Sequence, residues 1–258
     1  MKPMQVNSDY YLSENYPSLF KRYIESTDEK KRIAEALIER VKDKGYKTLL
    51  DMGAGDGMLT GMLAKHLERI YAVEKNQTHR EKLKKFPNVR VIGEQMEKIG
   101  DKEIKLIEKP EIVLFCYSLC SLKKDWIAPT LKSAFDFLAP GGEVLYISFK
   151  DGCQWDLYTT ELYRKLGLLK RGGIKQHDDD ILNAGYRVKC EREIPSSIHA
   201  SSLEELYKNL TFFFMPFHPQ YLSSFDEYGE ILQRYATVNS DGSAALAVTQ
   251  EIKKITLA

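Results

Sequence analysis

Three glycines and two carboxylates fall together in residues 51–57, which read Asp-Met-Gly-Ala-Gly-Asp-Gly. The glycines allow the backbone to turn sharply and to approach a ligand closely. A loop that binds pyrophosphate attracts an anion with its N–H groups, so the charges of Asp51 and Asp56 would oppose it. An acidic glycine loop suits a ligand with a cationic head. The pattern therefore favours S-adenosylmethionine, which carries ammonium and sulfonium groups, over NAD.

A further acid, Glu74, stands at the end of the next predicted strand. An acid about 20 residues beyond a glycine loop binds ribose hydroxyls in nucleotide-binding sheets. The alternative is a surface acid at a strand end, but the acidic loop favours the ribose role. The dinucleotide fingerprint G-x-G-x-x-G is replaced here by G-x-G-x-G, with Met58 in the third glycine position. This spacing again disfavours NAD.

Short β-like runs alternate with helical patterns along the chain, which predicts a parallel sheet covered by helices. The predicted strands are 47–52, 69–74, 89–93, 111–117, 143–149, 186–194 and 244–252, and the predicted helices are 28–41, 58–67, 77–85, 126–138, 155–169, 179–184, 202–214 and 220–235. We expect an α/β fold with a doubly wound, mostly parallel, seven-stranded sheet. The glycine loop and Glu74 then lie at carboxyl ends of strands, where open α/β sheets bind ligands.

The same pattern predicts a single domain over residues 1–258. It has an N-terminal helical arm, 1–45, and a helical cap, 196–240, inserted before the last strand.

Composition narrows the class of protein. The chain has 258 residues, 43% hydrophobic and 29% charged, as in soluble globular proteins, and its net charge of +1 gives no reason to expect a nucleic-acid partner. No apolar run is long enough to span a membrane, and no secretory leader is visible. The four cysteines and five histidines show no metal-binding spacing, so we expect free thiols, no metal and a cytoplasmic location. The oligomeric state stays open.

Five segments between residues 46 and 150 resemble the class I S-adenosylmethionine-dependent methyltransferases. They are LLDMGAGDG at 49–57, AVEKN at 72–76, GEQM at 93–96, FCYSLCSL at 115–122 and LAPGGEVLYIS at 138–148. The resemblance implies a Rossmann-like methyltransferase fold, a methyltransferase activity, and S-adenosylmethionine as donor with S-adenosylhomocysteine as product.

It also implies a set of cofactor-binding residues. The loop would hold the methionyl part, the acid after the second strand the ribose, the residues after the third strand the adenine, and those after the fourth strand would line the cofactor. The residues so implied are Asp51, Gly53, Ala54, Gly55, Asp56, Gly57, Glu74, Lys75, Glu94, Gln95, Met96, Cys116 and Tyr117.

Two other segments are similar to the histamine N-methyltransferase family. Residues 16–29 resemble its aromatic and basic N-terminal arm, which implies acceptor contacts by Tyr23 and by Asp28, at the place of the acid that binds the substrate amine. The alignment needs a one-residue gap, so Glu25 and Glu29 stay open, and Asp28 could instead cap a helix. Residues 152–157 resemble a Gly-Trp-Asp segment, which implies that Trp155 packs on the acceptor.

After the fourth strand, Ser118 aligns with a polar substrate contact of that family, whereas Ser121 and Leu122 replace a tyrosine pair. We therefore expect methyl transfer to nitrogen of a small amine or imidazole, with Asp28 and Tyr117 as catalytic candidates. The alternatives are O- or C-methylation of a small metabolite, or a protein that binds S-adenosylmethionine without catalysis. RNA or protein methylation is disfavoured by the near-neutral charge.

Overall fold

A computed structural model describes residues 2–3, 16–101, 106–169, 173–214 and 225–258. The chain forms two compact units. The sheet unit comprises Lys30–Ser148, His177–Ile194 and Glu251–Ala258. The helical unit comprises Met1–Glu29, Phe149–Gln176 and Pro195–Gln250.

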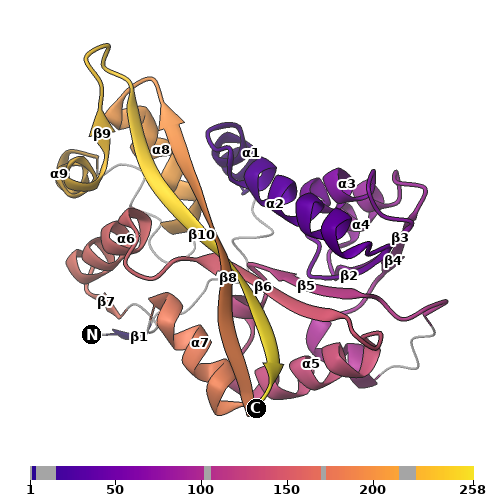
Figure 1. Ribbon diagram of the computed structural model, residues 1–258. Coiled ribbons are helices and arrows are strands. Elements are labelled where there is room, and N and C mark those ends of the chain that lie inside the picture. Colours follow the sequence, from indigo (N-terminus) through magenta and orange to yellow (C-terminus); the bar gives the residue numbers. More distant parts are fainter. Residues whose placement is uncertain (1, 4–15, 102–105, 170–172, 215–224) are drawn as a thin grey trace. The chain divides into compact units, whose positions relative to one another are not determined.

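The main sheet confirms the predicted α/β class (Figure 1). Its strands are β2 (Thr48–Met52), β3 (Arg69–Val73), β4 (Val89–Ile92), β5 (Ile112–Cys116), β6 (Glu143–Phe149), β8 (Tyr186–Ala200) and β10 (Ala244–Leu257), in the order β4-β3-β2-β5-β6-β10-β8. An eighth strand, β9 (Thr237–Val238), pairs antiparallel with β10. Strands β4, β3, β2, β5 and β6 pair in parallel. Because β2 lies between β3 and β5, the order reverses at β2, the switch point where such sheets bind ligands.

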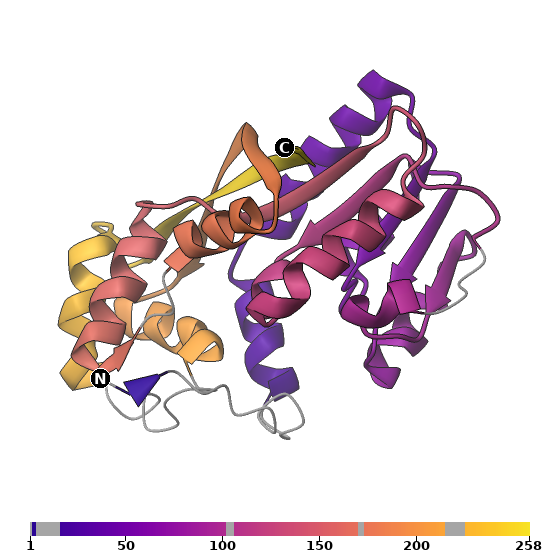
Figure 2. The same ribbon diagram turned by 90° about the horizontal axis from the view of Figure 1, so that it is seen from below.

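Helices cover both faces of the sheet in the sheet unit (Figure 2). Successive strand residues face opposite sides, so Leu49 packs with α2 (Glu29–Lys44) and α3 (Met58–Leu63), whereas Leu50 packs with α5 (Lys124–Phe137) and α7 (Gly173–Asn183). The unit also contains α4 (Gln77–Leu83) and two 3-10 turns, η2 (Met96–Asp101) and η3 (Leu119–Ser121). These two layers of apolar contacts hold the strands rigidly beneath the loops that follow them.

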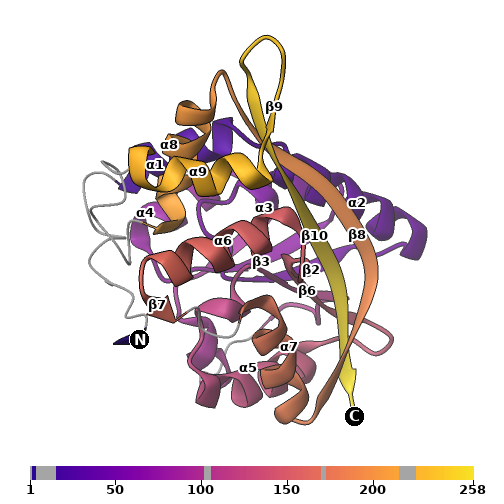
Figure 3. The ribbon, with the colours of Figure 1, turned by 90° about the vertical axis from the view of Figure 1, so that its left-hand side faces the viewer.

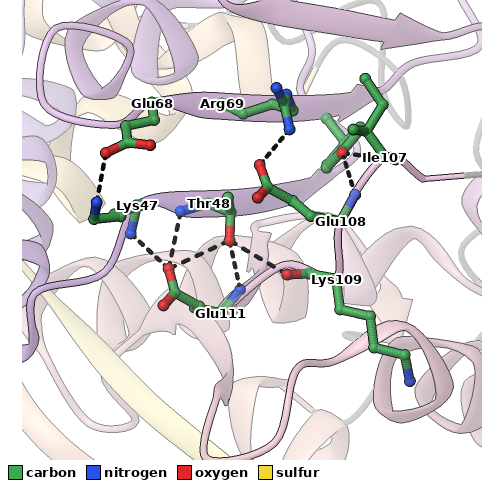
Figure 4. Close-up of polar contacts among 9 residues, drawn as sticks. Lys47, Thr48, Glu68, Arg69, Ile107, Glu108, Lys109 and Glu111 are labelled. Atoms are coloured by element: carbon green, nitrogen blue, oxygen red, sulfur yellow. Dashed lines mark hydrogen bonds and ion pairs between the residues drawn. The ribbon is translucent and has the colours of Figure 1, made fainter.

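Polar contacts fasten the amino ends of the central strands (Figure 4). The Glu111 carboxylate accepts hydrogen bonds from the backbone N–H groups of Lys47, at 2.6 Å, and Thr48, at 3.2 Å. An ion pair between Arg69 and Glu108 lies at the same end of β3. The predicted ligand loops lie at the opposite, carboxyl ends of these strands.

The helical unit has its own apolar core. It contains α1 (Tyr16–Glu25), α6 (Gln154–Lys165), α8 (Leu203–Phe214) and α9 (Phe225–Tyr235), together with the short parallel pair β1 (Lys2–Pro3) and β7 (Leu168–Leu169). Figure 3 shows α6, α8 and α9 side by side. The fully buried side chains of Tyr158, Tyr207 and Phe214 fill the space among them.

Several predicted boundaries are wrong. The helix predicted over 155–169 ends at Lys165, because Leu168–Leu169 form β7. The helix predicted over 58–67 ends at Leu63, and α7 begins six residues earlier than predicted. Residues 220–224 of another predicted helix lie outside the described residues.

The predicted arm, 1–45, is divided between the two units at Glu29, and the predicted cap, 196–240, lies within the helical unit. The single domain stays a prediction. No helix in the described ranges is long and apolar enough to cross a membrane.

Candidate active site

The glycine loop turns tightly at the end of β2. The N–H groups of Gly53 and Ala54 both donate to the Val73 carbonyl at 3.0 Å, so the loop is held against the end of β3. Gly53, Gly55 and Gly57 have φ values of 89°, 59° and 80°. This left-handed region strains residues that carry a Cβ atom, so glycine is required at each position.

The three glycines differ in what surrounds them. A Cβ on Gly53 would lie 2.8 Å from Ser118 Cβ, and one on Gly57 would lie 2.7 Å from Leu83 Cδ2. A Cβ on Gly55 would meet nothing within 4 Å. Gly53 and Gly57 thus serve close packing, whereas Gly55 borders open space that a ligand can use.

The carboxylate of Glu74 lies directly beside this open space. Its Oε2 atom accepts a hydrogen bond from the Gly55 N–H at 2.9 Å, and its Oε1 atom accepts one from the Asn76 N–H at 2.7 Å. His79 Nδ1 lies 4.0 Å from Oε1. Two backbone donors orient this nearly buried carboxylate, and its remaining lone pairs can accept hydroxyl groups.

Asp51 provides a buried acid under the loop. Only 2% of its surface is exposed, and burial raises the pKa of its carboxyl to about 6. The Thr60 hydroxyl donates to Asp51 Oδ2 at 2.7 Å and, with the charge of Lys30, opposes that rise. Asp56 forms a local turn instead, since its Oδ1 accepts from the Met58 N–H at 3.2 Å.

Of the residues predicted to contact the cofactor after β4, Met96 lies beside the glycine loop. The Met96 Cε atom is 3.9 Å from the position of a Cβ on Gly53. Glu94 Oε1 accepts from the Gln95 N–H at 2.9 Å. Lys75 has an exposed side chain, and its carbonyl accepts from Arg80.

The segment after β5 meets the loop and a lysine. Ser118 is 7% exposed and lies against Gly53, and its Oγ atom has no hydrogen-bond partner among the described residues. Tyr117 has φ of 56°, which is unusual for a bulky side chain. Lys30 Nζ lies 3.6 Å from Cys116 Sγ and 4.6 Å from the Tyr117 ring centroid.

Lys30 and Thr60 were not identified from the sequence. Both lie on helices in ordinary helical surroundings, and no local motif distinguishes them. Only the folded chain brings them to Cys116 and Asp51.

The remaining predicted acceptor residues belong to the helical unit. Tyr23 is buried, and its hydroxyl donates to Glu29 Oε2 at 2.8 Å. Asp28 Oδ1 accepts from the Ser197 N–H at 3.1 Å. Trp155 is 5% exposed and packs on the Phe213 ring, with centroids 4.6 Å apart.

Comparisons with known proteins bear on the family and the fold of the chain. Residues 20–136 match the family model of the DREV methyltransferases. This match covers less than half of the chain, and together with the fold it indicates an S-adenosylmethionine-dependent methyltransferase. No curated protein sequence matches it.

Solved structures share the fold of this methyltransferase at low sequence identity. The YcgJ protein of Bacillus subtilis is 11% identical with a TM-score of 0.53, covering 87% of this chain and 97% of its own. A candidate methyltransferase of Bacillus halodurans is 14% identical with a TM-score of 0.52, covering 85% and 97%. A candidate type II methyltransferase of Anaeromyxobacter dehalogenans is 16% identical with a TM-score of 0.52, covering 86% and 95%.

The side chains of this methyltransferase fit the family's cofactor chemically. Open space at Gly55 admits a ligand, Glu74 presents an oriented acceptor for ribose hydroxyls, and Asp51 offers negative charge to a cationic head. Among the described residues, no group of three histidine, cysteine or acidic side chains could hold a metal ion.

Proposed function

We propose that this methyltransferase transfers its methyl group to a nitrogen of a small amine or imidazole. The observation that carries the proposal is a buried carboxylate, Glu29, in the N-terminal arm. Glu29 is 2% exposed. Tyr23 donates to its Oε2 atom at 2.8 Å, and the Gln250 amide donates to the same atom at 3.4 Å. These two bonds from tyrosine and glutamine orient the carboxylate, and we propose that its negative charge attracts an ammonium or imidazolium group.

The contacts favour Glu29 over the other two acids of the arm. The Glu25 side chain is 66% exposed and forms an ion pair with Lys21 at 3.7 Å. Asp28 binds the Ser197 backbone, where the neighbouring residue Thr27 forms a β-bridge with Ile198. Asp28 therefore ties the arm to β8, and we assign the amine anchor to Glu29.

Aromatic rings of the helical unit support a cationic or aromatic acceptor. Tyr23 stacks on Phe212, with centroids 5.6 Å apart, and meets Phe213 edge-on at 4.6 Å. Trp155 packs against Phe213 and Phe149. Such rings attract cations through their π faces. Phe214 is fully buried and serves the core.

The proposed reaction needs little covalent chemistry from the chain. The bound cofactor supplies a methyl group that its sulfonium makes electrophilic. The residues of the chain orient the acceptor and exclude water, which can supply about 7–11 kcal/mol of the barrier. The attacking nitrogen must be neutral, and we propose that Tyr117 or a carboxylate accepts its proton.

A turnover screen with labelled S-adenosylmethionine tests the acceptor class. The panel contains biogenic amines, imidazoles, phenols and small carboxylic acids. Methyl transfer to an amine or imidazole is expected. Transfer only to oxygen or carbon acceptors would favour the O- or C-methyltransferase alternative. Binding of S-adenosylhomocysteine without any turnover would favour the non-catalytic alternative.

The substitution Glu29→Gln tests the anchor. We expect KM for the amine to rise by about tenfold or more, because a charge-assisted hydrogen bond is lost. Glu25→Gln is the matched control, since it removes an exposed acid of the same arm. The affinity for S-adenosylhomocysteine should stay unchanged in both variants. An unchanged KM in the Glu29 variant would refute the anchor.

A further inference from the structure

Lys30 places a positive charge beside the segment that follows β5. Its Nζ atom lies 3.6 Å from Cys116 Sγ and 4.6 Å from the centroid of the Tyr117 ring. Burial raises the pKa of the Asp51 carboxyl, and the positive charge of Lys30 lowers it. Lys30 therefore lies at the same edge of the sheet as the glycine loop.

Tyr117, whose ring contacts this ammonium, is itself held in place by its backbone. Tyr117 has φ of 56°, a backbone conformation that is strained for a bulky residue. Its N–H donates to the Ile147 carbonyl at 3.1 Å, which ties the turn to β6. The constrained ring lies under the ammonium group, and a cation over an aromatic face is attracted to it.

The sheet order tells which end of the cofactor would meet this lysine. Glu74 follows β3, the glycine loop follows β2, and Cys116 ends β5 with Tyr117 directly after it, so the three lie in that order along the edge. Neighbouring strands are about 4.8 Å apart, so the ends of β3 and β5 are about 10 Å apart. A cofactor with its ribose at Glu74 extends its methionyl chain across the loop towards β5.

The acidic side chains near the glycine loop call for a positive charge where the methionyl chain of the cofactor reaches β5. The methionyl group carries a carboxylate as well as an ammonium, and Asp51, Asp56 and Glu74 are all acidic. The ammonium and sulfonium suit these acids, whereas the carboxylate would be repelled by them unless a positive charge faces it. Lys30 supplies that charge next to Cys116 and Tyr117.

We propose that Lys30 binds the carboxylate of the methionyl group of the cofactor. This role rests on the cofactor of the class I methyltransferases and is independent of the acceptor proposed above. It makes Lys30 a cofactor-binding residue contributed by α2, outside the glycine loop and the other segments between residues 46 and 150 from which cofactor contacts are expected.

Two ligands separate this role from a structural one. S-adenosylhomocysteine carries the carboxylate, and its decarboxylated analogue S-adenosyl-3-thiopropylamine lacks it but keeps the adenosine, the thioether and the ammonium. Both are titrated by calorimetry into the full chain and into the Lys30→Met variant. We expect the variant to bind S-adenosylhomocysteine about ten- to a hundredfold more weakly and to bind the analogue within about twofold of wild type.

Two further variants complete the test. Lys30→Arg keeps the charge and should recover part of the affinity for S-adenosylhomocysteine. Lys31→Met removes an exposed lysine from the next position of the same helix and should change neither affinity. Equal losses for both ligands in Lys30→Met, or no loss for either, would overturn the role of Lys30. Failure of the wild-type chain to bind either ligand would instead overturn the cofactor assignment, and the inference with it.

Discussion

The charge on Asp51 should control cofactor affinity between pH 7 and pH 5. Burial raises the pKa of this carboxyl to about 6, although the Thr60 hydroxyl and the Lys30 ammonium favour the ionised form. The ionised carboxylate attracts the cationic head of the cofactor, whereas the neutral acid does not. Acidification through pH 6 should therefore weaken binding.

The size of the effect follows from the pKa. If the ionised form alone binds, the apparent dissociation constant scales with the inverse of the ionised fraction. With a pKa of about 6, the affinity at pH 5 should be about tenfold weaker than at pH 7, which corresponds to about 1.4 kcal/mol.

Calorimetric titration of S-adenosylhomocysteine from pH 5 to pH 8 measures this dependence. Asp51→Asn should bind more weakly at pH 7 and should lose the tenfold change, because its amide does not titrate. His79 lies 4.0 Å from Glu74 at the edge of the same site, so His79→Gln is the control. The same pH dependence in wild type and Asp51→Asn would refute the assignment to Asp51.

Fold stability provides an independent check because Asp51 affects it in the opposite direction. Its pKa is higher in the folded chain than the ordinary value of 3.8, so the neutral form is favoured by folding. The stability that this group contributes is fully present below about pH 3.8 and is lost as the pH rises through about 6. Acidification from pH 7 to pH 5 should therefore weaken the binding of S-adenosylhomocysteine, while the contribution of Asp51 to the stability of the fold increases. A fall in melting temperature of the ligand-free protein parallel to the loss of affinity would mean unfolding, and would contradict this explanation.

Two other predictions concern the loop and the interior of the sheet unit. Gly55→Arg should abolish the calorimetric signal of S-adenosylhomocysteine, because its side chain would fill the open space beside Glu74; unchanged affinity would contradict the cofactor site. Glu143 is 3% exposed and binds Arg40 at 2.7 Å and Lys254 at 2.8 Å, so Glu143→Gln should lower the free energy of unfolding by about 3 kcal/mol at pH 7, measured in urea. Burial raises the pKa of Glu143, but these two cations outweigh it and hold the pKa at about 2, below the ordinary 4.5. The stability that Glu143 contributes is therefore present above about pH 4.5 and is lost as the pH falls through about 2. The difference in free energy of unfolding between wild type and Glu143→Gln should therefore be smaller at pH 3 than at pH 7. An equal difference at both pH values would show that the charge of Glu143 is not its source.

Sequence patterns predicted the order and type of the main elements well. Strand β6 has the predicted bounds, and the other six predicted strands begin within one residue of their predicted starts. The C-terminal ends of strands are harder to predict, because pairing with distant strands can outweigh the local sequence signals that end a strand. β8 was expected to stop at Ile194 before a proline, yet it continues to Ala200. It is the last strand in the sheet order, and an edge strand tolerates Pro195 because one side of its backbone needs no partner.

The sequence predicts the methyl donor because the signals for it are local. Glycine spacing, two nearby acids and an acid after the next strand require no knowledge of distant contacts, and the structure places the Glu74 carboxylate on the Gly55 N–H. Charge and burial were decided by tertiary structure. Lys30 meets Cys116 across 86 residues, and Glu29 meets Gln250 across 221. Desolvation and Coulomb interactions depend on distances through space, which local sequence patterns do not contain. Only the folded chain could therefore show that Asp51 is a buried acid and that Asp28 is bound to β8. It also identified Glu29 and Lys30 as the residues to test.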